Sequence, residues 1–128
     1  MSKILRCWKT ETWSLIMLFL FLLPEKDLSR APSIPGISQF FHVTLFAGFS
    51  LFVIWDLSRI KSLAVPSRGI YLISIGLSVL YGTVIEFLQA VSNLGRHAEI
   101  LDVVFDLAGS VLVVLMVRLY FRSRRPTG

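Results

Sequence analysis

The sequence predicts an all-α, polytopic membrane protein, an antiparallel bundle of four transmembrane helices in a single domain. Hydrophobic residues make up 55% of the 128 residues and charged residues only 16%, and the mean hydropathy is +0.73. This composition lies well outside that of soluble globular domains. The apolar residues form long runs, and the basic residues stand in short clusters at the ends of those runs. Helices are expected because backbone hydrogen bonds in hydrocarbon must be closed within each span.

Four helices are expected along the chain. The first covers residues 5–23, where the apolar run WSLIMLFLFLL resembles the core of a signal peptide. The run is followed by PEKD without a small-residue cleavage pattern, so we expect a retained helix. Residues 39–57, 69–91 and 101–121 are each close to the ~20 residues that a helix needs to cross a bilayer.

The placement of Lys and Arg predicts the orientation of these spans. Ten of the thirteen would lie on the side that holds both termini: Lys3, Arg6, Lys9, Arg59, Lys61, Arg68, Arg118, Arg122, Arg124 and Arg125. An excess of basic residues marks the cytoplasmic side, so both termini are expected to be cytoplasmic. Clusters at segment ends, rather than one basic stripe, argue against nucleic-acid binding.

A stripe of small residues indicates how the third expected helix packs. Ser74, Ser78 and Gly82 recur every four residues and therefore share one face, where another backbone can approach closely. Continuing the stripe by four residues reaches Glu86. We therefore expect this carboxyl group to face the interior of the bundle.

Polar residues from three expected helices fall at a similar depth in the outer half of the membrane. They form a predicted polar cluster of His42, Glu86, Gln89, Asp102 and Asp106. Arg96, in the loop between the last two helices, is expected to fold over the cluster and pair with a carboxylate.

A purely structural role is the competing interpretation of the cluster. Asp102 would then cap the last helix, Arg96 would lie in solvent, and Glu86 would be a protonated hydrogen-bonding residue. We favour a functional pocket because a carboxylate within a span costs a few kcal/mol unless it has a partner or a role. His42 and the carboxylates suit several divalent ions. However, the chain has no HExxH or other close-ligand motif, so neither a metal nor any other cofactor is predicted.

These residues give the chain a resemblance to the VanZ-like family of small bacterial membrane proteins, named for a protein associated with resistance to the glycopeptide teicoplanin. The resemblance covers roughly residues 39–118 and makes residues 1–128 a single VanZ-like domain. The family pattern is matched in order by His42, EFLQ at Glu86 and Gln89, Arg96, Asp102 and Gly109. Gly109 is assigned with the small-residue stripe to helix packing. Where the family has Asn, this chain has Asp106, which adds a possible negative charge.

The resemblance implies an envelope protein of the bacterial cytoplasmic (inner) membrane with its polar site near the outer face. The leading hypothesis is binding of an envelope lipid or lipid-linked precursor, with an effect on envelope composition or glycopeptide susceptibility. Arg96 would contact an anionic group, while Glu86 and Asp102 orient hydroxyls or amines. The first alternative is an accessory or assembly subunit that docks on a membrane protein complex partner. The second is a membrane-embedded enzyme with Glu86 as general acid or base.

Overall fold

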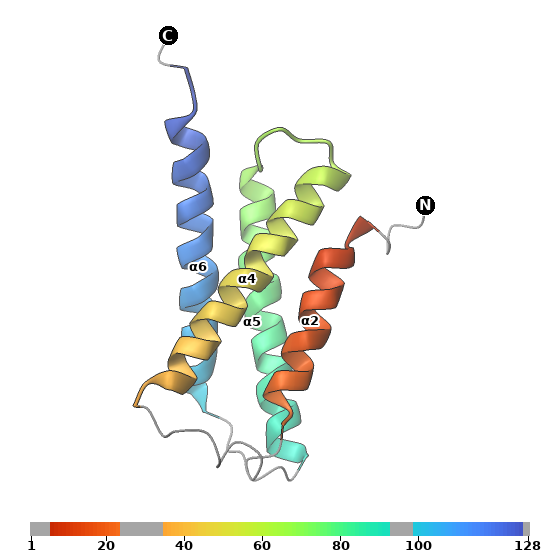
Figure 1. The fold of residues 1–128 in the computed structure, drawn as a ribbon, viewed down its shortest axis with the longest axis vertical. Helices are drawn as coiled ribbons and strands as arrows, with labels where there is room; N and C mark the ends of the chain where they lie inside the picture. The colour runs from red at the N-terminus through yellow and green to blue at the C-terminus, as the bar shows by residue number, and fades with distance from the viewer. Residues whose placement is uncertain (1–5, 24–34, 93–98, 127–128) are drawn as a thin grey trace.

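The computed structural model describes residues 6–23, 35–92 and 99–126, and these residues form a helical bundle without strands (Figure 1). The helices are α2 (Trp8–Phe21), α4 (Ile37–Ile60), α5 (Arg68–Val91) and α6 (Ile100–Ser123). The predicted fold class is confirmed.

Three of the helices, α4, α5 and α6, have 24 residues each and are long and apolar enough to cross a membrane. They begin one or two residues before the expected spans, and α4 and α6 also continue two or three residues beyond them. By contrast, α2 covers only 14 residues where residues 5–23 were expected. Its length of about 21 Å is less than the ~30 Å of a hydrocarbon core. Its end at Phe21 fits the position of Pro24, because a residue before proline disfavours the helical conformation.

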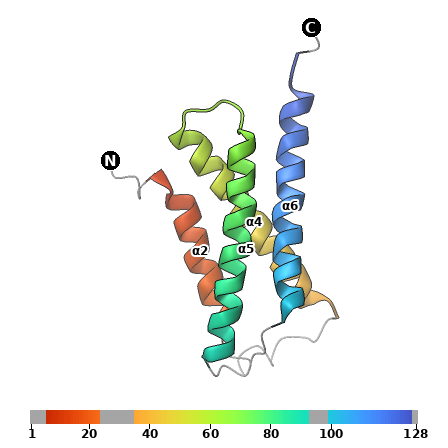
Figure 2. The same cartoon turned by 180° about the vertical axis from the view of Figure 1, so that it is seen from behind.

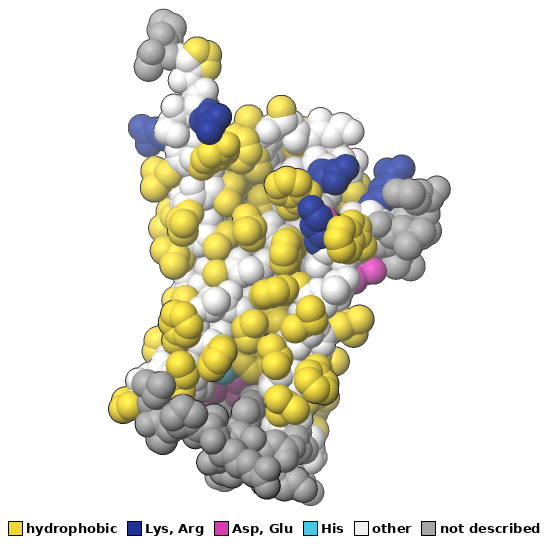
Figure 3. Space-filling model, in the orientation of Figure 1, with side chains coloured by type: hydrophobic (Ala, Val, Ile, Leu, Met, Phe, Trp, Pro, Cys, Tyr) yellow, Lys and Arg dark blue, Asp and Glu magenta, His cyan; other side chains and the backbone are white. Residues whose placement is uncertain are grey.

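The helices alternate in direction, so the two ends of the bundle differ in content. The described ends of the chain and the loop from α4 to α5 lie at one end, which we call the termini end (Figures 1 and 2). All Lys and Arg residues in the described part of the chain lie there, and Figure 3 shows those on one face of the molecule above a broad apolar surface. The opposite end, which we call the site end, holds the start of α4 and α6 and the end of α2 and α5.

The described residues form two apolar clusters in the interior. Met17, Phe46, Phe49 and Ile85 belong to the larger one, which joins α2, α4 and α5. The smaller one joins α4, α5 and α6 through Ile54, Ile70 and Val114. Many large apolar side chains remain exposed around the bundle, as expected for a surface that faces lipid acyl chains.

Serines connect the three long helices between these clusters. The Ser50 hydroxyl on α4 lies 2.8 Å from that of Ser78 on α5 and donates to that of Ser110 on α6 over 2.6 Å. The Ser74 hydroxyl donates to the Ser50 carbonyl over 3.2 Å. All four side chains are fully buried. The small-residue stripe of α5 thus faces α4 and α6, and its serines contribute hydrogen bonds as well as close packing.

Ser50 is at the centre of this network, and its replacement should weaken the bundle. We expect Ser50→Ala to lower the free energy of unfolding by about 1 kcal/mol, as is typical of hydrogen bonds between helices in membranes. Titration of the micellar protein with sodium dodecyl sulfate measures this change. Thr83→Ala is the control, because Thr83 is exposed and its hydroxyl bonds the Val79 carbonyl within its own helix. A midpoint equal to that of the control would contradict a stabilising role for the network.

The short helix α2 is held by polar side chains at both ends. Near its start, one carboxylate oxygen of Asp56 on α4 accepts from the Thr10 N–H over 3.0 Å and from the Thr10 hydroxyl over 2.8 Å. At its other end, the Gln89 amide on α5 donates to the Phe21 carbonyl over 2.7 Å. Partners from the neighbouring helices thus satisfy backbone groups that a helix terminus leaves open.

Candidate functional site

The candidate site lies at the site end of the bundle, where α4, α5 and α6 meet. His42 belongs to the second turn of α4, Glu86 lies five residues before the end of α5, and Asp102 and Asp106 lie in the first two turns of α6. His42, Glu86 and Asp106 are buried, and the Asp102 side chain is 15% exposed. The alternating helix directions bring these residues together although they are up to 64 positions apart.

His42 is held between two carboxylates of α6. Its Nδ1 lies 2.7 Å from Asp106 Oδ1, and its Nε2 lies 3.7 Å from Asp102 Oδ2. When Asp106 is ionised its carboxylate only accepts hydrogen bonds, and Nδ1 is then the donor in this contact. The ring also packs against that of Phe21, with 4.6 Å between the centroids. The orientation of the imidazole is therefore determined by the two α6 carboxylates at its nitrogen atoms and by Phe21 of α2 against the ring.

Glycines make room for this arrangement. A Cβ atom at Gly82 on α5 would collide with Oδ2 of Asp106, so the glycine leaves space for the carboxylate beside His42. A Cβ atom at Gly109 on α6 would collide with the backbone carbonyl of Val43, the residue after His42. Both glycines therefore determine how closely the helices that carry the site approach one another.

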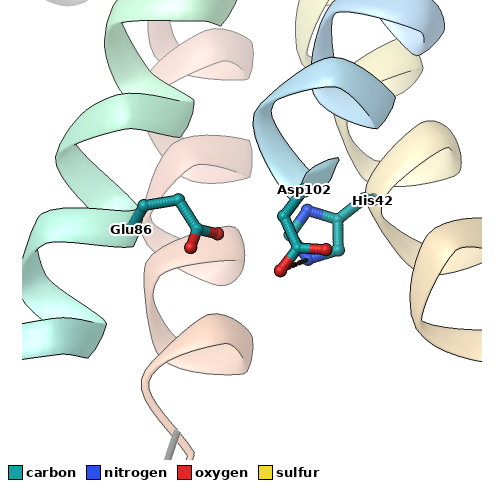
Figure 4. A group of neighbouring side chains, drawn as sticks. All are labelled: His42, Glu86 and Asp102. Atoms are coloured by element: carbon teal, nitrogen blue, oxygen red, sulfur yellow. Dashed lines mark ion pairs between the residues drawn. The ribbon is translucent and has the colours of Figure 1, made fainter. Parts of the chain in front are cut away.

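Glu86 reaches toward His42 and Asp102 from the other side of the cluster, as Figure 4 shows. Its Oε2 accepts from the Glu99 N–H over 3.0 Å, directly before α6 begins. Its Oε1 is buried and has no hydrogen-bond partner within the part of the chain that the structure describes. Among the residues that the structure describes, one acceptor oxygen of the cluster is thus left without a hydrogen bond.

Gln89, one residue of the predicted polar cluster, stands apart from this group. The Gln89 side chain is buried, but its amide nitrogen bonds the Phe21 carbonyl at the end of α2. Arg96 lies outside the described residues. The sequence interpretation missed the contributions of Phe21 and of the Glu99 backbone N–H, which depend on where α2 ends and α6 begins.

The remaining residues form a compact set of acceptors. His42, Glu86 and Asp102 each offer one ligand atom, and these atoms lie within 4.8 Å of one another. Imidazole nitrogen and carboxylate oxygens accept hydrogen bonds from hydroxyl and ammonium groups, and they also bind divalent cations. The arrangement can therefore recognise a ligand that carries such donors or a positive charge.

The fold and the site together define a multi-pass membrane protein with a buried group of His, Glu and Asp at one end of a helical bundle. A family model described as VanZ/LLP1 matches residues 3–121, and the chain belongs to this family. The match confirms the resemblance and extends it over α2, beyond residues 39–118. No curated protein and no solved structure matched the chain.

Proposed function

We propose that this VanZ-like envelope protein binds the polar head group of an envelope lipid or lipid-linked precursor through His42, Glu86 and Asp102. The observation that carries the proposal is Glu86 Oε1, a buried acceptor without a partner among the described residues, on a carboxylate that is directed toward His42 and Asp102. A buried acceptor without a hydrogen bond is costly, and a hydroxyl or ammonium group of a ligand would remove that cost.

The depth of the cluster supports a lipid as the ligand. His42 is five residues from the start of α4, and Glu86 is five residues from the end of α5, which corresponds to about 8 Å at 1.5 Å per residue. The hydrocarbon core of a bilayer is ~30 Å thick, and the whole bilayer is ~40–45 Å thick. The difference is the thickness of the two head-group regions together. A lipid in the surrounding bilayer therefore carries its polar groups near this depth.

The distribution of charge supports the orientation within the proposal. Because all Lys and Arg residues in the described ranges lie at the termini end, we place that end in the cytoplasm. The site end then faces outward from the bacterial cytoplasmic membrane, where envelope precursors are used. Arg96, outside the described residues, is proposed to contact an anionic group of the ligand, and the resulting activity would alter envelope composition or glycopeptide susceptibility.

Native mass spectrometry of the full chain, extracted gently from its own membrane, tests the proposal. We expect one enriched envelope lipid on the wild-type protein, and about tenfold less of it on Glu86→Gln and Asp102→Asn, the cost of one charge-assisted hydrogen bond. Glu11→Gln is the control, because Glu11 is exposed near the termini end. Equal lipid retention by all four proteins would contradict the proposal. A stoichiometric protein partner without lipid would favour the accessory-subunit hypothesis instead.

The same variants can be compared in cells at matched membrane abundance. If the head-group site carries the biological effect, Glu86→Gln and Asp102→Asn should shift teicoplanin susceptibility toward that of cells lacking the protein, while Glu11→Gln should not. Unchanged susceptibility in both site variants would count against an effect on glycopeptides.

A further inference from the structure

Three side chains that could act as metal ligands converge from three different helices. His42 on α4, Glu86 on α5 and Asp102 on α6 each place one donor atom within 4.8 Å of the other two (Figure 4). Proximity of acidic groups alone does not make a metal site. Two further features of these residues, one at Glu86 and one at His42, point to a bound cation.

The first feature is the unsatisfied oxygen of Glu86. The residue is only 6% exposed, and its Oε1 lacks a hydrogen-bond partner among the described residues. Figure 4 shows its carboxylate directed toward His42 and Asp102. With Asp102 and Asp106 close by, three carboxyl groups share one largely buried space, and a divalent cation would satisfy the free oxygen and offset their charge.

The second feature is the way His42 is oriented. Its Nδ1 bonds the buried carboxylate of Asp106 over 2.7 Å, and its Nε2 faces Asp102. Histidines that bind metals usually donate their other ring N–H to a carboxylate or carbonyl, which selects the tautomer and makes the metal-binding nitrogen more basic. Gly82 provides the space that Asp106 needs for this contact.

We propose that His42 Nε2 and the carboxylates of Glu86 and Asp102 bind one divalent transition-metal ion, with Asp106 positioning His42. One imidazole and two carboxylates form a three-ligand set of the kind that Zn²⁺ occupies with a fourth position open. At ordinary Zn–N and Zn–O distances, tetrahedral ligand atoms lie about 3.3 Å apart. The 3.7 Å between His42 Nε2 and Asp102 Oδ2 is close to this value. The ligand atoms lie up to 4.8 Å apart, so binding of the ion would bring the two most distant ligand atoms closer together by up to about 1.5 Å.

The sequence offered no motif for such a site because the ligands are not close along the chain. The fold brings them together, so the absence of HExxH does not count against a metal here. The inference does not rest on the proposed lipid, because the three side chains would hold the ion without one. Both ligands would use the same side chains, so a bound ion would take the place of a head-group donor at Glu86 Oε1.

Zn²⁺ alone, added to the chelator-treated full chain in detergent, tests the site. The protein is purified without a histidine tag, and metal content and affinity are measured by elemental analysis and calorimetry. We expect about one Zn²⁺ per chain, with affinity at least tenfold lower in Glu86→Gln, Asp102→Asn and His42→Gln. The exposed-site variant Glu11→Gln should bind like the wild type. No binding by the wild type, or equal binding by all variants, would overturn the proposal.

X-ray absorption of the wild-type zinc complex keeps the test independent of how the variants fold. One imidazole together with oxygen ligands is expected. Sulfur scattering would assign the ion to Cys7, and a spectrum without imidazole would exclude His42, so either result would overturn the site. Since no envelope lipid is present, such a failure leaves the head-group proposal standing on its own lipid-retention experiment.

Discussion

Replacing Gly109 by alanine is expected to destabilise the bundle by about 3 kcal/mol, the upper end of what overpacking costs. The added methyl group would collide with the carbonyl oxygen of Val43 and lie 3.0 Å from its carbonyl carbon. Both atoms are backbone within α4, so no side-chain rotation relieves the contact. Separation of α6 from α4 is the remaining response, and it would affect the most extensive helix contact in the bundle.

Gly76→Ala is the matched control for this experiment. Gly76 also lies within a long helix, but an added Cβ atom there meets nothing within 4 Å. Because alanine has a higher helix propensity than glycine, this variant should be slightly more stable than the wild type, by about 0.5–1 kcal/mol at most. Unfolding in sodium dodecyl sulfate gives both values. If the two variants have the same midpoint, close contact at Gly109 does not determine stability.

The sequence allowed the helices and the depth of the site to be predicted, because both follow from segment length and chain direction. Apolar runs of about 20 residues with basic ends predict spans, and alternating spans place His42, Glu86 and Asp102 at one end. The four-residue spacing of Ser74, Ser78 and Gly82 likewise identifies one face without reference to other helices.

Rotation about each helix axis and the ends of α2 could not be predicted in the same way. Depth did not reveal that Asp106 bonds His42 Nδ1 while Asp102 faces Nε2, because this depends on how α6 turns toward α4. Nor did it show that Gln89 bonds Phe21, since that contact requires α2 to end beside α5. Ser50 and Ser110 are isolated serines within apolar runs, and only tertiary packing gives them partners.

Two substitutions at Asp106 should have very different effects, because one retains a hydrogen-bond acceptor for His42 and the other does not. Asparagine keeps a side-chain oxygen that can accept from Nδ1. We expect Asp106→Asn to cost about 1 kcal/mol, comparable to one neutral hydrogen bond. Leucine has a similar size but leaves the buried N–H unsatisfied, and Asp106→Leu should cost about 3 kcal/mol.

The measurement is the free energy of unfolding in micelles for the wild type and both Asp106 variants, together with His42→Leu and His42→Leu/Asp106→Leu, which complete a double-mutant cycle with Asp106→Leu. If the 2.7 Å contact between His42 and Asp106 stabilises α4 against α6, the double variant should regain part of the stability that Asp106→Leu loses. In the double variant neither partner of this contact is left as an unpaired buried polar group. Additive effects of the two leucine substitutions would contradict this. Recovery would show that the contact that orients the His42 ring toward Glu86 and Asp102 also contributes to the packing of α6 against α4.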